Sequence, residues 1–572
     1  MLPAGVVAVA EEDFCEALKK PEPLEEFRRG RLENVAYESL REWMRALEKA
    51  GELKRVTAEV SPRLEMAELA DRASKSGAGT VKAGGPALLF ENVQGYPGAR
   101  VLMNQFGSAQ RMKLALGVDS LEEVADRIRL LLNPAPVDGF LAKLKMLPML
   151  AEVGGYFPKR LEGAAAKSAP CKEVILREAD VDVLKFPILT TWPGDGGPFI
   201  TLPCVTTRDL KSGKRNVGMY RMQVYDGRTT GMHWQRQKVA AEHFRERLRA
   251  AAGSIPGAVH LMAATAGGSA AAAQDAGFVT QSDVPQHVAA KIRGERMEVA
   301  VAIGTDPAVT FSAIVPAPPE VEEYLIAGFL RGHAVELVKC ETVDLDVPAT
   351  AEIVLEGYVE LGELRTEGPF GDHTGYYTMQ DEYPVFHITC ITHRRDPVYA
   401  ATVVGKPPME DAWMIKAVER IFLPLMRLTI PEIVDINLPH EGVAHNLMIV
   451  SIRKSYAGQA RKVMHAIWGL GQAMFTKCIV VVDEDCDVQD LGEVMLRAGN
   501  NIDPERDIQF TLGPVDSLDH ASRLPNFGSK MGIDATRKWA AEGFTRPWPE
   551  MLTMPDEVKA RVDAIWKSLT AS

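Results

Sequence analysis

The chain lacks the features that mark secreted, membrane-spanning and disulfide-rich proteins. It has 572 residues but only seven cysteines, and no two of them form a C-x-x-C pair. An odd, scattered set of thiols argues against a disulfide framework and against structural zinc, so we expect buried thiols in a reducing cytoplasm. No run of about 18 apolar residues occurs, so no transmembrane helix is expected. The short apolar start has no basic region before it, so no signal peptide is expected either.

Basic charge is also scarce. Lys and Arg total 65 against 77 Asp and Glu, which gives a formal net charge of −12, and the basic residues are interspersed with acids. A nucleic-acid binder usually carries a basic face, so we expect no nucleic-acid partner. A phosphate-binding G-x-x-x-x-G-K-[ST] loop is absent as well. The hydrophobic fraction of 46% allows sizeable cores, and the length suggests roughly three or four domains.

The first part of the chain reads as an extension followed by an α/β module. Residues 1–35 are charged and contain Pro, which predicts a weakly ordered extension. Apolar residues at helical spacing over 39–56 stop at Gly51, and short strands and a helix over 120–133 follow. These elements predict an N-terminal α/β module at 36–155. Its last stretch, KLKMLPMLAEVGGYF, carries Met and Leu at helical spacing, for which membrane contact and a buried face are both open.

The pattern of apolar residues changes twice in the rest of the chain. Residues 156–405 contain successive strand patterns and predict a β-rich, split-barrel-like domain, with PVYAATVVG as its last strand. An Ala- and Gly-rich stretch at 250–290 interrupts them, and we expect it to be a mobile surface insertion. Residues 406–572 read as a linking helix and a C-terminal α/β domain that ends in an amphipathic helix. The predicted fold class is therefore mixed α/β and β.

Two acids stand in the stretch RTEGPFGDHTGYYT at 365–378. Glu367 and Asp372 bracket a turn that contains an aromatic, and a histidine and two tyrosines follow. Ordinary turns carry one Asp or Asn that bonds its own backbone. The alternatives are a solvated acidic turn and an acid–base pair in which like charge and burial raise the pKa of one acid.

A second polar stretch, RNVGMYRMQVYDGRTTGMHWQRQK, begins at residue 215. A strand here presents Arg221, Gln223 and Tyr225 on one face. Arg221 could pair with a carboxylate through two hydrogen bonds or form an ordinary structural salt bridge. Gly218 would let the backbone approach a ligand closely.

The motifs NVGMYRMQ, EGPFGDHTGYY, GKPPMED and FGSKMGIDATRK, in this order, resemble the UbiD family of prenylated-FMN-dependent decarboxylases. The resemblance runs from about residue 38 to the C-terminus. It implies that the β-rich domain binds the flavin and that an azomethine ylide on the flavin forms a covalent adduct with the substrate. It also implies a catalytic triad of Arg221, Glu367 and Asp372, in which Arg221 pairs with Glu367 and Asp372 protonates the carbon that CO2 has left.

The resemblance further implies the binding residues for the flavin and its cations. The expected flavin contacts are Met219, Tyr220, Arg221, His233, Trp234, Gln235, Lys238, Val239 and Lys406. Lys406 matches a phosphate-contacting lysine of some members, and the alternative is a surface lysine. The family holds the phosphate with Mn2+ or another divalent metal and K+, which places metal ligands at Asn216, Gln237 and Glu323, with Glu322 as the adjacent candidate.

The sequence departs from the family at two places. Position 237 is typically His, whereas this chain has Gln237, so we expect a weaker metal site. The insertion at 250–290 is the second departure.

The predicted function is therefore a cytoplasmic carboxy-lyase acting on an aromatic or hydroxyaromatic acid. Asn500 and Asn501 could bond the substrate or serve as turn residues. The expected partners are a flavin prenyltransferase and further copies of the chain, as a dimer or hexamer formed through the C-terminal domain. Peripheral membrane contact is expected only for a polyprenylated substrate. The alternative function is a non-catalytic flavin-binding subunit with an impaired metal site.

Overall fold

The computed structural model describes residues 37–77, 79–80, 83–132, 151–235, 237–252, 294–317 and 321–570. The predicted N-terminal extension, nearly all of the 250–290 insertion and the first half of KLKMLPMLAEVGGYF lie outside these residues. Among the residues described, no helix is both long and apolar enough to cross a membrane. The six cysteines in this part of the chain are free thiols.

The N-terminal module is a four-stranded sheet covered by helices. The helix predicted from residue 39 is α3 (Leu40–Lys49): the Ser39 side chain accepts from the backbone N of Glu42 at its start, and Gly51 follows its end at φ +73°. The sheet contains β1 (Leu53–Val56), β2 (Ala87–Phe90), β3 (Arg100–Met103) and β16 (Val398–Ala400) in this order. Further helices are α4 (Glu65–Lys75), α5 (Ala109–Leu116) and α6 (Leu121–Leu132).

The fourth strand of this sheet corrects a prediction. The sequence assigned PVYAATVVG to the β-rich domain, but β16 pairs in parallel with β3, with Val398 opposite Arg100. The chain therefore returns from the central domain to complete the N-terminal sheet. A parallel strand needs such a long crossover, which a local reading of apolar runs does not reveal.

The central domain is built on an antiparallel seven-stranded sheet. Its path runs β10-β15-β14-β11-β7-β8, and β5 pairs with β15. The path has two ends among the described residues, so the sheet is open rather than a closed barrel. The strands are β5 (Val174–Arg177), β7 (Pro203–Arg208), β8 (Arg215–Met219), β10 (Thr229–Gly231), β11 (Arg296–Ile303), β14 (Ile353–Glu367) and β15 (Asp381–His393).

Both faces of the central sheet are buried. In β11, Val299, Val301 and Ile303 face one core, whereas Ala300 and Ala302 face another core that is shared with α3 and the N-terminal sheet. Side chains alternate across a strand, so a strand between two cores reads as a continuous apolar run. Smaller elements complete the domain: β4 (Lys159–Arg160), α8 (Gly163–Lys167), β6 (Phe199–Ile200), β9 (Met222–Gln223), α9 (Val239–Ala252), α13 (Pro307–Ser312), α14 (Glu323–Arg331), β12 (Glu336–Lys339) and β13 (Asp346–Pro348).

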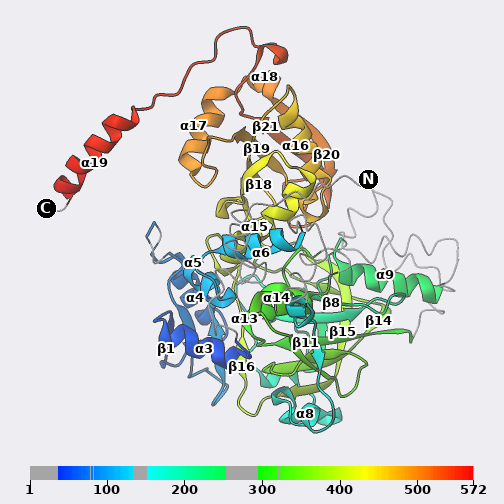
Figure 1. Ribbon diagram of the computed structural model, residues 1–572. Helices are drawn as coiled ribbons and strands as arrows, with labels where there is room; N and C mark the ends of the chain where they lie inside the picture. Colours follow the sequence, from blue (N-terminus) through cyan, green and yellow to red (C-terminus); the bar gives the residue numbers. More distant parts are fainter. Residues whose placement is uncertain are drawn as a thin grey trace, which may run out of the picture.

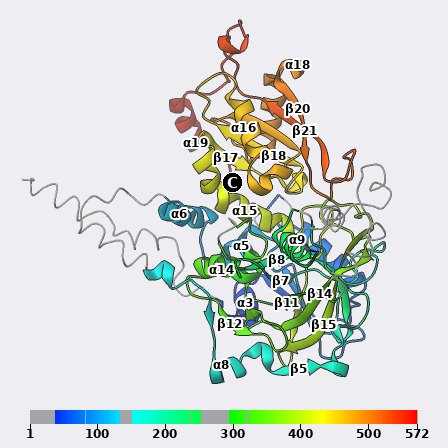
Figure 2. The same ribbon diagram turned by 90° about the vertical axis from the view of Figure 1, so that its right-hand side faces the viewer.

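The predicted linking helix is α15 (Glu410–Thr429), which lies between the central sheet and the C-terminal sheet in both views (Figures 1 and 2). The C-terminal sheet has the order β17-β18-β19-β21-β20 and a core on each side. Its elements are β17 (Ile433–Asn437), β18 (Leu447–Ile452), α16 (Gln459–Trp468), β19 (Cys478–Asp483), α17 (Leu491–Asn501), α18 (Pro504–Asp507), β20 (Ile508–Pro514) and β21 (Phe527–Asp534).

The last helix, α19 (Asp556–Thr570), extends away from the C-terminal sheet (Figure 1). Its apolar stripe is exposed: Val558 is 44% exposed, Val562 48% and Ile565 51%. The predicted amphipathic helix is therefore present, but its apolar side chains are not buried.

Candidate active site

The turn at 365–378 joins β14 to β15 and carries the predicted acid pair. Glu367 is the last residue of β14, and Asp372 lies in the turn that follows. Glu367 is 1% exposed and Asp372 is 6% exposed. A solvated acidic turn is therefore excluded, and both carboxyl groups need buried partners.

Side chains from an earlier part of the domain fix this turn. Gln223 Oε1 accepts a hydrogen bond from the backbone N of Gly368 (2.7 Å), and Asp195 Oδ1 accepts one from the backbone N of Gly371 (2.8 Å). The indole of Trp192 lies against Gly371, where an added Cβ would come within 2.1 Å of the ring. Glycine is therefore required at 371 for packing, and the acids sit on a rigid support.

Arg221 joins the two acids. It follows β8, and its Nε and Nη2 donate to Glu367 Oε1 over 3.1 and 3.0 Å, while Nη1 donates to Asp372 Oδ2. The Arg221 side chain is 10% exposed, and its Cζ lies 4.6 Å from the centroid of the Phe370 ring. The structure thus brings together the three residues predicted as the triad, in a buried arrangement where ion pairs are poorly screened.

A histidine binds each of these acids. His233 Nδ1 lies 2.7 Å from Glu367 Oε2, and His373 Nδ1 lies 2.8 Å from Asp372 Oδ1. The sequence predicted His233 only as a flavin contact and gave His373 no role. We call Arg221, Glu367, Asp372, His233 and His373 the acid cluster.

The charges of the cluster correct the expected pKa pattern. Like charge and burial were expected to raise the pKa of one acid. Burial does act in this direction, but the positive charge of Arg221, together with His233, holds the pKa of Glu367 below its usual value. Burial also acts to raise the pKa of Asp372. The charges and hydrogen bonds of Arg221 and His373 outweigh this effect, so the pKa of Asp372 lies further below its usual value than that of Glu367 does. Both acids are therefore ionised in this arrangement.

The two ends of the central sheet meet beside the acid cluster. The backbone N of His233 donates to the carbonyl of Arg221 over 3.3 Å, and Val224 pairs with Thr230. This junction collects most of the predicted flavin contacts on three adjoining segments: Met219, Tyr220 and Arg221 from β8 onward, His233, Trp234 and Gln235 after β10, and Lys238 and Val239 at the start of α9. The predicted flavin contacts therefore meet at the split between the sheet ends, and their role in binding stays a prediction.

A tyrosine ring packs against one glycine at the junction. An added Cβ on Gly218 would lie 2.4 Å from ring atoms of Tyr220. The Tyr220 ring, which is 8% exposed, therefore fills the space that a side chain at 218 would take, and the approach of a ligand to Gly218 stays a prediction. The glycine in the sequence indicated that a side chain would not fit at position 218, but not that the Tyr220 ring fills the space.

Three of the predicted binding residues have buried polar atoms without a hydrogen-bond partner among the described residues. These atoms are Asn216 Nδ2, His233 Nε2 and Trp234 Nε1. Buried donors and acceptors are almost always satisfied in folded proteins. Their clustering at one junction fits a polar group bound there.

The predicted metal ligands come partly together. Glu323 begins α14, and its Oε2 accepts from the backbone N of Val217, next to Asn216 (2.8 Å). Gln237 lies half-buried in the turn before α9. We call Asn216, Gln237 and Glu323 the oxygen cluster. In the described part of the chain, no group of three or more His, Cys, Asp or Glu residues could hold a metal, so the oxygen cluster as a metal site stays a prediction.

The remaining predicted residues lie apart from these clusters. Lys406 is exposed, and its backbone packs beside Gly375 of the acid turn. Asn500 and Asn501 end α17, where their side chains donate to the carbonyls of Leu496 and Ala535. The two side-chain amides therefore form hydrogen bonds within the C-terminal domain, and both residues are helical rather than turn residues.

The sequence missed the groups that the C-terminal domain and α15 bring to the acid turn. His445, which lies just before β18, has its Nε2 3.3 Å from His373 Nε2. Asp411 in the first turn of α15 and Asp516 after β20 exert their charge on His373. Lys238 Nζ donates to Gln472 Oε1 of the C-terminal domain over 2.7 Å. Only the motif GKPPMED, which contains Asp411, carried a sequence signal for any of these.

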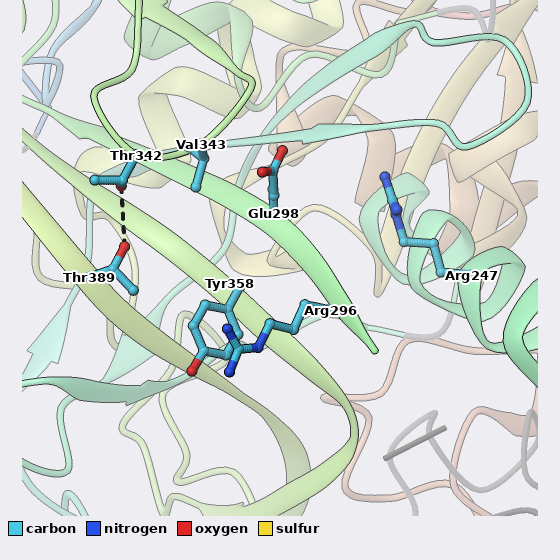
Figure 3. Close-up of a pocket in the computed structure, with 7 residues that line it drawn as sticks. All are labelled: Arg247, Arg296, Glu298, Thr342, Val343, Tyr358 and Thr389. Atoms are coloured by element: carbon cyan, nitrogen blue, oxygen red, sulfur yellow. Dashed lines mark hydrogen bonds between the residues drawn. The ribbon is translucent and has the colours of Figure 1, made fainter. Parts of the chain in front are cut away.

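A cavity of about 450 Å³ lies elsewhere, between α9 and the strands of the central sheet (Figure 3). Arg296 stacks on the ring of Tyr358, with 3.9 Å between Cζ and the ring centroid, and Thr342 bonds Thr389 (3.2 Å). Its lining is Arg247, Arg296, Glu298, Thr342, Val343, Tyr358 and Thr389. No member of the acid cluster or oxygen cluster is among them, so we assign the chemistry to the acid turn.

Comparison with known families gives three matches along the chain. The N-terminal domain model of 3-octaprenyl-4-hydroxybenzoate carboxy-lyase (UbiD) matches residues 44–130. Its Rift-related domain model matches 163–276 and 273–407, and its C-terminal domain model matches 412–535. An uncharacterized protein of Archaeoglobus fulgidus is 51% identical over 536 residues, which cover 94% of this chain and 99% of the relative.

Solved structures agree with these matches. The UbiD-class enzyme HmfF from Pelotomaculum thermopropionicum, in complex with FMN, is 30% identical with a TM-score of 0.67, covering 91% of this chain and 98% of HmfF. An evolved dimeric HmfF with prenylated FMN is also 30% identical, with a TM-score of 0.65 and the same coverage. The closed form of Sedimentibacter hydroxybenzoicus vanillic acid decarboxylase is 26% identical with a TM-score of 0.72, covering 93% and 99%. The chain therefore belongs to the UbiD family and is a carboxy-lyase, as its motifs predicted.

Proposed function

We propose that this protein is a prenylated-FMN-dependent, non-oxidative (de)carboxylase of an aromatic or hydroxyaromatic acid. The observation that carries the proposal is the buried Arg221, which binds Glu367 and Asp372 at the junction of the sheet ends. Similarity to HmfF, whose structures contain FMN or prenylated FMN, and to vanillic acid decarboxylase supports it.

The residues at the junction fit such a cofactor. The unpartnered Asn216 Nδ2, His233 Nε2 and Trp234 Nε1 offer hydrogen bonds to a polar group between the sheet ends. The flavin contacts are those predicted from β8, β10 and α9, and Lys406 would contact the phosphate. When bound, the prenylated flavin would supply an electron sink through a covalent adduct with the substrate, because charge left on an sp2 carbon cannot enter its own ring π-system.

The oxygen cluster would hold the cations that neutralise the flavin phosphate. Asn216 and Gln237 offer amide oxygens and Glu323 offers a carboxylate, all of which suit a hard divalent ion such as Mn2+. K+ is the expected second cation. The contact of Glu323 with the backbone N of Val217, adjacent to Asn216, supports a shared site.

The acid cluster would do the remaining work. Arg221 keeps one face of its guanidinium on Phe370 and three of its N–H groups on the two acids, so it fixes where both carboxylates point. We assign Arg221 and Glu367 to orienting the substrate carboxylate. We assign Asp372 to delivering the proton to the carbon that CO2 leaves. General acids of this kind contribute roughly 10²–10⁴-fold to a rate.

The competing proposal is a non-catalytic flavin-binding subunit. It would follow from the loss of the metal through Gln237. The complete set of ion pairs around Arg221 argues against it, because burying these charges costs desolvation and a site without chemistry has no need of all three residues.

The deciding experiment is expression of the protein with a flavin prenyltransferase, followed by a screen of aromatic acids for CO2 release. We expect turnover with prenylated FMN and none with FMN alone. Turnover by protein that holds only FMN would refute the cofactor assignment. A loaded protein that binds aromatic acids but releases no CO2 from any of them would favour the non-catalytic subunit.

The expected partners follow from the same proposal. The prenyltransferase supplies the cofactor, and the exposed apolar stripe of α19 supports self-association, since Val558, Val562 and Ile565 lie on one side of the helix. Removing residues 545–572 should reduce the number of subunits in the assembly, which light scattering measures through the molecular mass. An unchanged mass would place the interface elsewhere. The free thiols support the cytoplasm as the expected location.

A further inference from the structure

His373 lies between the catalytic turn and the C-terminal domain. Its Nδ1 and its backbone N are 2.8 and 2.7 Å from Asp372 Oδ1, and its Nε2 is 3.3 Å from His445 Nε2. The two rings are nearly perpendicular, at 85°, with centroids 5.3 Å apart. One ring nitrogen of His373 therefore faces a carboxylate oxygen and the other faces a ring nitrogen that accepts when His445 is neutral and protonated at Nδ1. This arrangement fits a doubly protonated imidazolium.

The charges around His373 favour the same state. Asp372 on its own turn, Asp411 at the start of α15 and Asp516 after β20 face it, and His445 is the other titratable neighbour. Burial opposes a charge on the ring, but its bond to Asp372 and the three negative charges raise the pKa of His373 to about 9. Burial lowers the pKa of His445, so the second ring stays neutral and accepts.

This arrangement answers a difficulty in the proposed reaction. Asp372 is held ionised by Arg221 and His373, so it has no proton of its own to give. The nearest transferable proton is the one on His373 Nδ1, which points at Asp372 Oδ1. Arg221 keeps its protons under all ordinary conditions and cannot be the source.

We propose that His373 stores the proton that Asp372 passes to the substrate carbon, and that His445 is a positioning residue that holds His373 in place. This inference rests on the proposed decarboxylase function. His373 acts through Asp372 and need not touch the substrate.

The proton balance is simple. The electron pair of the broken carbon–carboxylate bond stays on the substrate carbon and forms the new C–H bond, and CO2 leaves. Asp372 delivers the proton and takes one from His373 Nδ1, so that Asp372 ends as a carboxylate and His373 as a neutral ring. The His373 side chain is 22% exposed, so a proton from solvent can restore the imidazolium before the next turnover.

The position of His445 is fixed by its own backbone. Its N–H donates to the carbonyl of Val443 (2.8 Å), and its carbonyl accepts from the backbone N of Lys477 (2.8 Å). Val443 and Ala444 have φ values of 43° and 66°, which L residues adopt rarely and at a cost, often at functional sites. The backbone immediately before His445 is therefore held in a costly conformation, and this segment of the C-terminal domain places the His445 ring beside His373.

The first test is a titration of the histidine ring carbons by NMR, with the purified full-length protein and no substrate. The chain has 12 histidines, so His373→Asn and His445→Gln identify the two signals and His465→Asn, an exposed residue of α16, serves as a control. We expect the His373 signal to titrate near pH 9, and to shift down by more than about one unit in Asp372→Asn. Titration of His373 below pH 7 in the wild-type protein would overturn the proposal.

The second test uses variants in the loaded enzyme. His373→Asn keeps a donor near Nδ1 but no transferable proton, so we expect kcat for CO2 release to fall roughly 10²-fold or more. The wild-type rate should also fall as pH rises through about 9, and the pH–rate profile of His373→Asn should lack this fall. His445→Leu removes the acceptor and should lower the pKa of His373 by about one unit, whereas His445→Gln, which keeps an acceptor, should restore it.

The outcomes separate this inference from the proposed function. A His373→Asn variant within about threefold of wild-type kcat would show that the proton comes from elsewhere, since loss of a real proton source costs far more. A loaded wild-type enzyme without any decarboxylation would overturn the proposed function, and the transfer step with it. An active enzyme in which His445→Leu and His445→Gln have the same His373 pKa would remove His445 from the proposal.

Discussion

The acid cluster and the oxygen cluster lie on neighbouring segments of one domain, yet they differ in how complete they are. In the acid cluster, Arg221 binds both carboxylates and each carboxylate also binds a histidine. In the oxygen cluster, the buried Asn216 Nδ2 has no partner among the described residues, and Glu323 accepts from one backbone N–H. Both carboxylates of the first cluster are bonded within the chain, although His233 Nε2 in this cluster has no partner among the described residues. The second cluster keeps the amide donor of Asn216 for an external group.

This difference separates two kinds of requirement. A satisfied buried ion network holds a geometry before any ligand arrives, and breaking it leaves uncompensated charge. An unsatisfied set of polar groups has a cost in the free protein that a ligand can remove. We therefore expect changes in the acid cluster to affect the fold and the rate together. Changes in the oxygen cluster should appear mainly in the affinity for metal and cofactor.

Arg221→Met should have the largest effect, because it removes the shared partner of two buried acids. Breaking such a pair typically costs about 3–5 kcal/mol of unfolding free energy. We expect a loss of this size in urea unfolding, and a fall in CO2 release of more than about 10³-fold, since both acids lose their orientation. Arg72→Met is the control: its side chain is 75% exposed, and exposed pairs of this kind are worth about 0.3–0.5 kcal/mol. Equal stability losses in the two variants would mean that the acid cluster does not support the fold.

Asp372→Asn should retain the flavin and lose roughly 10²–10⁴-fold in kcat, the usual contribution of a general acid. It should also change the pH dependence of stability. The pKa of Asp372 is lowered on folding, so its stabilising effect is present above the unfolded-state pKa of about 3.9 and is lost as pH falls through the folded-state pKa. The wild-type unfolding free energy should therefore fall more steeply from pH 5 to pH 2 than that of the variant. Parallel curves, or a near-normal rate, would move the proton donor to another residue.

The acid cluster also shows how far the sequence alone could lead. Family motifs identified Arg221, Glu367 and Asp372. The expected alternation placed Arg221, Gln223 and Tyr225 on one side, and all three contact the segment 366–368, Tyr225 through its hydroxyl to the Thr366 carbonyl (3.0 Å), although only Gln223 lies in the short strand β9. The pKa directions could not be predicted, because they depend on two histidines brought in by tertiary contacts. His445 was missed for the same reason, since its partner lies 72 residues away in the chain. The crossover of β16 into the N-terminal sheet is a further long-range pairing without a local signal.

The oxygen cluster can be examined through the metal itself. Ligand binding to the folded state raises the unfolding free energy by about 2.7 kcal/mol at a ligand concentration of 100 times Kd. We expect added Mn2+ to raise the melting temperature of the wild-type protein with cofactor, and Glu323→Gln to lose this rise. The matched control is Glu322→Gln, because Glu322 Oε1 is already engaged by Arg215 Nε (2.7 Å). The same Mn2+ shift in Glu323→Gln as in the wild type would exclude Glu323 as a ligand.

Gln237→His should have the smallest effect, and it tests the one position at which we expect the oxygen cluster to depart from its family. Gln237 lies half-buried in the turn before α9. An amide oxygen is a competent ligand for a hard ion, and the other oxygens tolerate exchange in a flexible shell. The ring nitrogen of a histidine is held more firmly, because its second nitrogen can bond a neighbour.

We therefore expect Gln237→His to tighten Mn2+ binding by up to about tenfold and to raise the flavin occupancy after purification, with kcat at saturating Mn2+ unchanged. Metal content by mass spectrometry and Mn2+ titration followed by electron paramagnetic resonance measure this without reference to turnover. Equal Mn2+ affinities in the two proteins would mean that Gln237 points away from the metal, and that Asn216 and Glu323 hold it with the flavin phosphate and water alone.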